Sequence, residues 1–333
     1  SWASKVKDLK IIEAFLSETR KKAPNSYDEA VGRMKEALGD PSWRSLYKDV
    51  HSPLMTTTAP TMEATGLLSD VNRCVLHPYY EIEGQKQGRM KAINAFAKTY
   101  NPHTLGKDPD LRPPLGEHYI LFDYNNMEVS MLAWLSQDKR LQAILESGRD
   151  VYETIWMFMM DQTPTENTRR ICKETFLPVI YGMGEGSLAE KFGNLEAARL
   201  VITAIHNRFP VAMSYLRTIQ NSTSPNGLVR DHFGRPRIFE HGSHKIRNFV
   251  IQSPAAIVCE ERLIALERSI RGSASLVFHV HDGYALTCRE KEIEHIFAMS
   301  KATLETQTSL CEGLNLRVSG TVGDHLDTLR KPA

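Results

Sequence analysis

Apolar residues follow two different periods along this chain. At helical spacing they recur within residues 5–20 and 27–38, which predicts two amphipathic helices there. A continuous apolar run at 119–122 is instead typical of a buried strand, and it stops at Asp123. Similar runs at 276–280 and 284–288 predict two more strands.

Between and after these strands the pattern is mainly helical. We expect a helix from Asn125 or Asn126 to Leu135, and helices almost throughout residues 151–216. A long helix at 248–266, interrupted by Pro254, and another at 290–308 complete the pattern. Helices, a strand, a helical insertion and a strand hairpin, in that order, favour a mixed α+β core with a helical lobe.

Composition excludes few classes of protein. The chain has 333 residues, a hydrophobic fraction of 41% and a formal net charge of +1, which neither requires nor excludes a nucleic-acid partner. Its five cysteines form no Cys-x-x-Cys pair, so we expect a reducing intracellular compartment without a zinc site. Neither a membrane span nor a signal peptide is apparent, and the first residue, Ser1, suggests a trimmed chain or a piece of a longer one.

Two aspartates end apolar runs, Asp123 after the first strand and Asp282 after the second. Carboxylates with few other ligands suit Mg²⁺, which takes its remaining coordination from water and phosphate oxygens. The alternative for Asp282 is structural, because Asp-Gly between two strands is a strong hairpin-turn signal. His279 and His281 alternate on the preceding strand, where packed histidines are more common than ligands.

Between the two aspartates in the sequence lies a stripe of basic, apolar and aromatic side chains. Arg169, Lys173, Leu177 and Tyr181 follow one another at intervals of four residues, so on a helix they share one slowly drifting face. Such a face offers cations for a triphosphate at one end and an aromatic ring for a flat base at the other. The alternative is a surface helix with solvated charges.

Taken in order, these segments resemble the family A DNA polymerases. Residues 123–136 look like the family's motif A, 169–182 like motif B and 280–283 like motif C. Further similar segments are 76–77, 88–90, 148–152, 233–237 and 248–256. The resemblance spans about residues 68–333 and depends on the order of motifs that are individually weak.

The resemblance implies a right-hand polymerase fold of the α+β class. We expect an antiparallel-sheet palm, helical fingers, a shortened helical thumb and no exonuclease domain. In residues, the thumb and lead-in would be 1–70, the first palm section 71–135, the fingers 136–240 and the second palm section 241–333. The implied reaction is template-directed transfer of deoxynucleotides from dNTPs to a primer 3′-hydroxyl.

The family's site residues carry over position by position. The resemblance implies that Asp123 and Asp282, helped by the backbone carbonyl of Tyr124, bind two Mg²⁺ ions, with Mn²⁺ as a substitute. Asp123, Asp282 and Lys173 would be catalytic. The implied dNTP-binding residues are Arg169, Lys173, Tyr181, Glu128, Asn126, Tyr152 and Leu177. The implied DNA-binding residues are Arg89, Gly182, Asn248, Gln252, His281 and Arg235.

Glu128 bears on the choice of sugar. Beneath the sugar, its bulk and charge would exclude a ribose 2′-hydroxyl, and the related single-subunit RNA polymerases lack a carboxylate at the matching position. DNA synthesis is therefore favoured over an RNA polymerase or primase. A catalytically weak, polymerase-like module that binds primer–template is the other alternative.

Several positions depart from the family pattern. Pro178 removes a helical hydrogen bond and clashes with the carbonyl of Glu174, at a cost of about 3 kcal/mol, so we predict a kink between these residues. Phe176 lies about 100° away from the face on which Leu177 replaces the family's stacking aromatic. The remaining departures are Gly283 for a glutamate, Ser130 for an arginine and Tyr152 for a histidine.

The partners follow from the same resemblance. We expect a monomer that binds primed DNA and dNTPs and no membrane, with a separate exonuclease or processivity factor as a possible partner. Only about 70 residues precede the recognisable region, so we expect no proofreading. The expected location is the cytoplasm of a bacterial or phage-infected cell, and an organellar location stays open.

Overall fold

The computed structural model describes residues 67–69, 75–76, 79–81, 91–93, 111–224, 227–324 and 329–330. The helices expected at 5–20 and 27–38 and Arg89 lie outside the described residues, as does the expected thumb and lead-in (1–70) except for residues 67–69. Two compact units divide the chain. The sheet unit holds residues 1–127, 233–235 and 253–333, and the helical unit holds 128–232 and 236–252.

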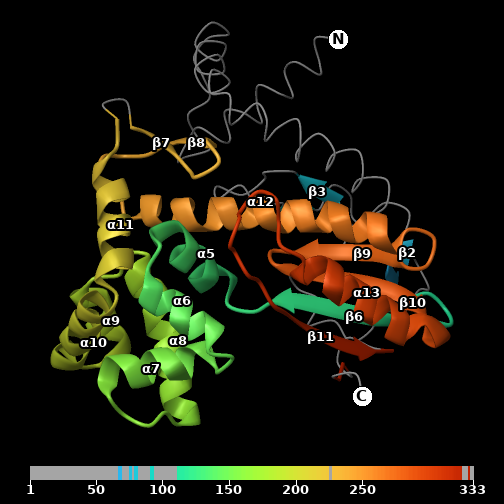
Figure 1. The fold of residues 1–333 in the computed structure, drawn as a ribbon, viewed down its shortest axis with the longest axis horizontal. Helices are drawn as coiled ribbons and strands as arrows, with labels where there is room; N and C mark the ends of the chain where they lie inside the picture. The colour runs from blue at the N-terminus through green and yellow to red at the C-terminus, as the bar shows by residue number, and fades with distance from the viewer. Residues whose placement is uncertain are drawn as a thin grey trace, which may run out of the picture. The chain divides into compact units, whose positions relative to one another are not determined.

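The core of the sheet unit, within the described ranges, is a four-stranded antiparallel sheet (Figure 1). Its order is β11 (Val318–Gly323), β6 (Glu117–Tyr124), β10 (Gly283–Arg289) and β9 (Ser275–Val280). All three strands expected from the apolar runs are therefore confirmed. Tyr119, Val277, Phe278 and Ala285 form a buried cluster within this sheet.

Helix α13 (Ile293–Glu305) covers the sheet, after a short 3₁₀ turn at Glu290–Glu292. It contacts β11, β6 and β10, and the Phe297 ring lies 4.9 Å from the Phe122 ring. The helix expected at 290–308 is thus present with slightly different bounds.

Short strands precede the main sheet along the chain. β1 (Leu67–Ser69) pairs with β2 (Val75–Leu76) and β5 (Leu111–Arg112), and β3 (Tyr79–Glu81) pairs with β4 (Lys91–Ile93). All of these pairings are antiparallel.

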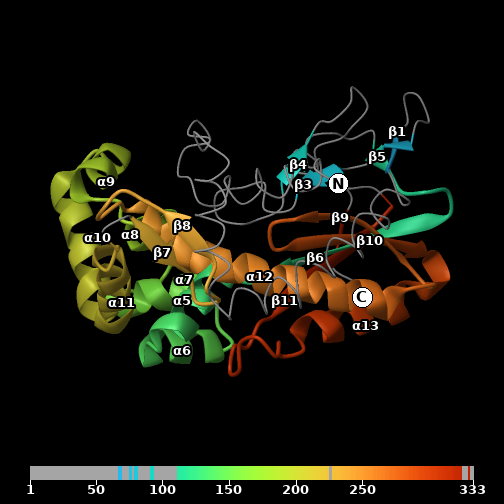
Figure 2. The same cartoon turned by 90° about the horizontal axis from the view of Figure 1, so that it is seen from above.

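The helical unit confirms the helical pattern of residues 151–216. Its helices include α6 (Lys139–Glu146), α7 (Val151–Met160), α8 (Glu166–Ile180), α9 (Glu185–Phe192), α10 (Leu195–Arg208) and α11 (Pro210–Asn221). α5 (Met127–Ser136) leads into them, and a hairpin of β7 (Leu228–Arg230) and β8 (Pro236–Ile238) follows. α10 packs against α9 and α11 (Figure 2).

Local signals explain where these helices begin. Thr165 and Thr168 form a reciprocal capping box at the start of α8, and Asn194 accepts two backbone N–H bonds at the start of α10. The buried carboxylate of Asp138 caps α6 and also accepts from the backbone N of Ala212 at 3.1 Å. A single aspartate therefore joins the beginnings of α6 and α11.

Helix α12 (Lys245–Ile270) is longer than expected. We expected Pro254 to interrupt it, but the helix continues through this residue. Its first residues belong to the helical unit and residues 253–270 to the sheet unit. Among the described residues, none of the helices combines the length and apolar character needed to cross a membrane.

Candidate active site

The two aspartates lie at the same end of the antiparallel sheet. Gly283, the residue after Asp282, pairs with Asp123 in the register of β10 and β6. In addition, the backbone N–H of Tyr124 donates to the carbonyl of Asp282 at 3.2 Å. Strand register therefore brings together two carboxylates that are far apart in the sequence.

The hairpin turn explains part of this arrangement. β9 ends at Val280 and β10 begins at Gly283, which leaves His281 and Asp282 as the connection. Asp282 can therefore be both a residue of the hairpin turn and a metal ligand. Our expectation that His281 lies on a strand is wrong, because its φ of 55° places it in the left-handed region of the turn.

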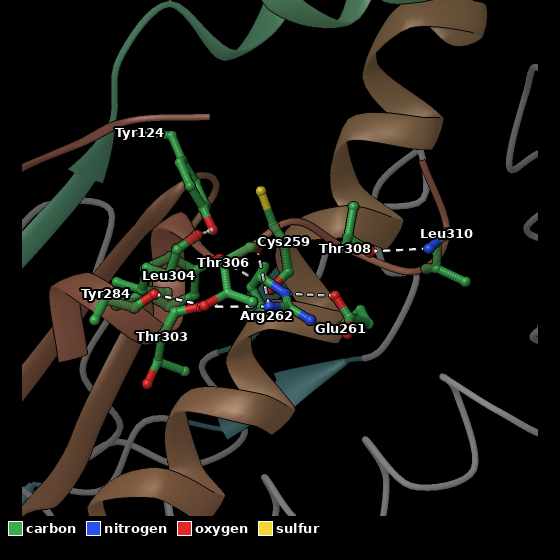
Figure 3. A network of polar contacts seen from close by, with 11 residues as sticks. Tyr124, Cys259, Glu261, Arg262, Tyr284, Thr303, Leu304, Thr306, Thr308 and Leu310 are labelled. Atoms are coloured by element: carbon green, nitrogen blue, oxygen red, sulfur yellow. Dashed lines mark hydrogen bonds and ion pairs between the residues drawn. The ribbon is translucent and has the colours of Figure 1, made fainter. Parts of the chain in front are cut away.

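Tyr124 fixes the end of β6 (Figure 3). Its side chain is buried and its hydroxyl donates to the carbonyl of Leu304 at 2.8 Å, while its ring packs edge-on against Tyr284. Burial raises the pKa of Tyr124, so the hydroxyl stays protonated as a donor. Since adjacent strand residues point to opposite faces, anchoring Tyr124 leaves Asp123 exposed on the other face.

Further hydrogen bonds hold α12 and α13 around this anchor. The hydroxyl of Tyr284 donates to the carbonyl of Cys259 at 2.9 Å, and Arg262 donates to the carbonyls of Thr303 and Thr306 at 3.4 and 3.2 Å (Figure 3). Glu261 pairs with the same guanidinium. The strand end that carries Asp123 is therefore tied to α12 and α13 through Tyr124 and Tyr284.

The chemistry of the donors fits a divalent cation with hard oxygen ligands. Asp123 and Asp282 supply carboxylates, and the carbonyl of Tyr124 lies next in sequence. Within the described ranges, no three His, Cys, Asp or Glu residues form a group that could hold a metal ion. A Cβ atom at Gly283 would lie 3.4 Å from Oδ1 of Asp123, so this glycine leaves one side of that carboxylate uncovered.

The helical unit contains a separate cavity of about 930 Å³ along α8. The expected stripe faces it, because Arg169, Lys173, Leu177 and Tyr181 all line its wall. The other residues of the wall are Glu128, Glu166, Asn167, Arg170, Glu174, Pro178, Lys191 and Gln252. The stripe is therefore the wall of a cavity and not a uniformly solvated surface.

Arg169 is held by a partner outside α8. Its Nε and Nη2 atoms lie 2.8 and 2.7 Å from Oδ2 of Asp150, the residue that caps α7 through the backbone N of Glu153. Burial opposes ionisation of Asp150, but the hydrogen bonds from Arg169 and Glu153 outweigh it and lower the pKa of the carboxyl. The same pair raises the pKa of Arg169.

Glu128 and Tyr181 are joined through Gln252. The amide Nε2 of Gln252 donates to Oε1 of Glu128 at 2.5 Å and lies 3.5 Å from the hydroxyl of Tyr181. These residues come from α5, α12 and the C-terminal cap of α8. Residues that the motifs assign separately to sugar, base and primer–template contacts thus form one polar group.

At the aromatic end of the stripe, Leu177 and Phe176 point in different directions, as expected. Leu177 lines the cavity, whereas Phe176 is fully buried and its ring lies 5.6 Å from that of Phe209. Gly182 has a φ of 97°, and a Cβ there would lie 2.9 Å from the Cβ of His244. A glycine is therefore required at 182 by backbone conformation and packing, whatever strand passes nearby.

The other expected contacts have different surroundings. Tyr152 is buried and is not among the residues of the cavity wall. Asn126 has a φ of 54° directly before α5, and Asn248 is half-buried on α12. The helix continues through Pro178 to Ile180, and the kink stays a prediction.

Arg235 requires a correction. We expected it to contact DNA, but its side chain has no exposed surface. Instead its Nη1 donates to the hydroxyl of Ser253 at 3.0 Å and its Nη2 lies 4.0 Å from Glu260. A side chain without exposed surface cannot reach DNA in this conformation, so the structure favours a role in the core.

Sequence reasoning missed two residues of the cavity region. Asp150 gave a signal, since an aspartate directly before a helix is a common cap, but its pairing with Arg169 depends on how α7 and α8 pack. Lys191 gave no signal in the sequence, because it resembles any solvated lysine near the end of a helix.

Comparisons with known proteins decide the family. The profile of DNA polymerase family A matches residues 111–328, which is more than half of the chain. The chain belongs to the family A DNA polymerases. Its fold agrees, since the POL domain of Pol1 from M. smegmatis, in complex with DNA primer-template and dNTP, superposes with a TM-score of 0.68 at 18% identity. That match covers 94% of this chain and 58% of the other.

Curated relatives give the same result at low identity. DNA polymerase I of Chloroflexus aurantiacus is 26% identical over 66% of this chain, and the thermostable DNA polymerase I of Thermus filiformis is 25% identical over 75%. DNA polymerase theta of Drosophila melanogaster is 24% identical over 59%. The matches span 25%, 34% and 11% of those proteins, so this polymerase chain corresponds to one part of each.

Proposed function

We propose that this chain is a template-directed DNA polymerase that transfers deoxynucleotides from dNTPs to a primer 3′-hydroxyl. The observation that carries the proposal is the α8 cavity, whose wall presents Arg169 and Lys173 at one end and Tyr181 at the other. A cavity of this kind matches a triphosphate joined to a base. Membership of family A supports the reaction class.

Asp123, Asp282 and the carbonyl of Tyr124 would hold two Mg²⁺ ions, for which Mn²⁺ can substitute. When bound, such ions supply Lewis-acid stabilisation of the attacking and leaving oxygens. The protein's own contribution is to fix the carboxylates at the ends of paired strands, with Tyr124 anchored to Leu304.

Arg169 and Lys173 would bind the triphosphate. Their fixed charges become most valuable as negative charge grows on the leaving oxygens. The bond to Asp150 holds the guanidinium of Arg169 in one orientation before substrate arrives. Lys173, four residues along the same face, would stabilise the leaving phosphates as the catalytic cation.

Tyr181 would stack near the new base pair, and Leu177 and Asn126 would complete the nucleotide contacts. Glu128, held by Gln252, would occupy the space of a ribose 2′-hydroxyl. Arg89, Gly182, Asn248, Gln252 and His281 would lie along primer and template. The divisions into palm, fingers and thumb given above belong to the same proposal.

We also propose that this chain does not proofread. A separate exonuclease or processivity factor would then act with the polymerase, which we expect to be a monomer in the cytoplasm of a bacterial or phage-infected cell. Incubating the chain with a mismatched, end-labelled primer tests this: release of nucleotides from the 3′ end would contradict it.

Primer extension tests the main proposal. Wild type, Asp123→Ala and Asp282→Ala are compared on a primed template with dNTPs and Mg²⁺, and Glu294→Ala on the exposed face of α13 is the matched control. We expect extension by wild type and control, and a loss of at least about a thousandfold in both aspartate variants. Absence of extension by wild type with Mg²⁺ or Mn²⁺, with retained primer–template binding, would favour a non-catalytic binding module.

A further inference from the structure

Pro178 lies near the end of α8, where the helix should lose a hydrogen bond. Proline has no backbone N–H, so the carbonyl of Glu174 has no donor four residues along the helix. The helix nevertheless continues to Ile180, and the backbone N of Tyr181 bonds the carbonyl of Leu177 at 3.1 Å. Glu174 is exposed, so either water or a side chain from outside the helix can serve as the replacement donor at this carbonyl.

Lys191 of α9 supplies that donor. Its Nζ donates to the backbone carbonyl of Glu174 at 2.9 Å. The same ammonium lies 3.6 Å from Oε2 of the Glu174 side chain. Lys191, Glu174 and Pro178 all line the α8 cavity, so this bond lies in the wall of the candidate nucleotide site.

The position of this bond divides the stripe. Arg169 and Lys173 precede Glu174, whereas Leu177 and Tyr181 lie beside or beyond Pro178. A missing hydrogen bond at Glu174 would leave the angle between these two halves poorly fixed, because prolines are common points of helix bending. The cationic end and the aromatic end would then lose their mutual alignment.

We propose that Lys191 is a positioning residue that replaces the hydrogen bond lost at Pro178 and aligns the two halves of the nucleotide-binding face. It acts through the backbone of α8 and not through the substrate. This inference rests on the proposed function for its kinetic consequence, although its structural part does not.

Two other roles for Lys191 make different predictions. In the first, the ion pair with the Glu174 carboxylate is the important contact, but both side chains are more than 40% exposed and such pairs contribute little. In the second, Lys191 binds the triphosphate directly. Neither role depends on whether residue 178 is proline, so a double-mutant cycle separates them from the proposal.

The first experiment measures thermal unfolding of Lys191→Met, Pro178→Ala and the double variant in the full chain. Alanine restores the N–H at 178, so we expect Lys191→Met to lower the Tm by about 3 °C with proline present and by less than half of that with alanine. Glu174→Gln should preserve this coupling, because it removes the carboxylate and keeps the carbonyl. Equal losses in both backgrounds, or no loss in either, would overturn the proposal.

The second experiment measures steady-state kinetics of dNTP incorporation for the same variants. We expect Lys191→Met to raise KM for dNTP about fivefold with a smaller change in kcat, and Pro178→Ala to suppress most of this rise. Lys191→Arg should recover part of the wild-type KM, since a guanidinium can also donate to a carbonyl. Lys301→Met on α13 is the matched control for an exposed lysine.

Outcomes for the two proposals are separable. An unchanged rise in KM in the alanine background would show that Lys191 contacts the nucleotide, and it would overturn the positioning role. Absence of any extension by wild type would contradict the proposed function instead, and the unfolding cycle would still decide the role of Lys191.

Discussion

Gln252 holds Glu128 by a hydrogen bond of 2.5 Å from its amide Nε2 to Oε1 of the carboxylate. The two residues are 124 positions apart in the sequence, and the same amide also lies 3.5 Å from the hydroxyl of Tyr181. A glutamate side chain that is free to change rotamer would be a poor steric barrier by itself. A carboxylate fixed in one orientation can act as a barrier at one defined position, as the role proposed for Glu128 requires.

We predict that Glu128→Ala relaxes sugar selection. Removing the carboxylate should raise the efficiency of NTP use relative to dNTP use by at least about tenfold, because the space for a 2′-hydroxyl becomes available. Gln252→Leu should also raise the efficiency of NTP use relative to dNTP use, but by less, because it releases the Glu128 carboxylate without removing it. Single-nucleotide incorporation with matched dNTP and NTP measures both, and unchanged selection in Glu128→Ala would contradict the assignment.

Asp150 offers a second test of the cavity. Asparagine can still cap α7 but cannot neutralise Arg169, so Asp150→Asn should leave the helix intact and disorder the guanidinium. We expect KM for dNTP to rise by about two- to fivefold, a modest effect because both side chains are partly exposed. Far-ultraviolet circular dichroism checks the helix. A lower KM would mean that Asp150 competes with the triphosphate for Arg169.

The helical unit should lose stability in mild acid. Burial lowers the pKa of His206, helped by Arg217 and Arg247, and burial also lowers the pKa of His232 despite Asp231. The unfolded chain, with histidine pKa values of about 6.5, therefore binds more protons than the folded chain below that pH. The free energy of unfolding should consequently fall as pH decreases from about 7.5 to about 5.5.

Urea denaturation at those two pH values measures this difference. The double variant His206→Asn and His232→Asn should show a smaller dependence on pH, whereas His295→Asn, on the exposed face of α13, should behave as wild type. Asp150, whose pKa is also lowered, titrates below this window and contributes no slope within it. An identical slope in the double variant would assign the effect to other groups.

Gly320 tests the packing of the sheet unit. A Cβ at this position would lie 2.5 Å from two atoms of the Phe297 ring and 2.8 Å from Phe122, so Gly320→Ala should reduce the free energy of unfolding by about 1–3 kcal/mol. Phe297→Leu should relieve part of that cost in the double variant, because the neighbouring ring is removed. Additive losses would show that the strand moves away from α13 instead.

Much of the fold follows directly from the sequence because its signals are local. The apolar runs ending at Asp123 and near Asp282 predicted the strands, since a buried strand needs continuous apolar residues. The spacing of four predicted that Arg169, Lys173, Leu177 and Tyr181 share one helix face, and all four line the same cavity. The order of the motifs also predicted the family, which the profile match confirms.

Other properties depend on which elements pack together, and the sequence does not specify these. In the sequence, Arg235 looks like an arginine on a DNA-binding surface. In the structure its side chain packs against Ser253 and Glu260 and is completely buried. Nothing local in Pro178 indicates that Lys191 of another helix compensates for its missing N–H.

The sequence by itself therefore determined the strands that lead to the two aspartates, the side chains that share one face of α8, and the family. Tertiary structure alone decided how those groups are oriented, through Asp150 on Arg169, Gln252 on Glu128 and Lys191 on the carbonyl of Glu174. The physical reason is that periodicity along one element fixes which face a side chain occupies, whereas the partner that meets this face comes from a distant segment.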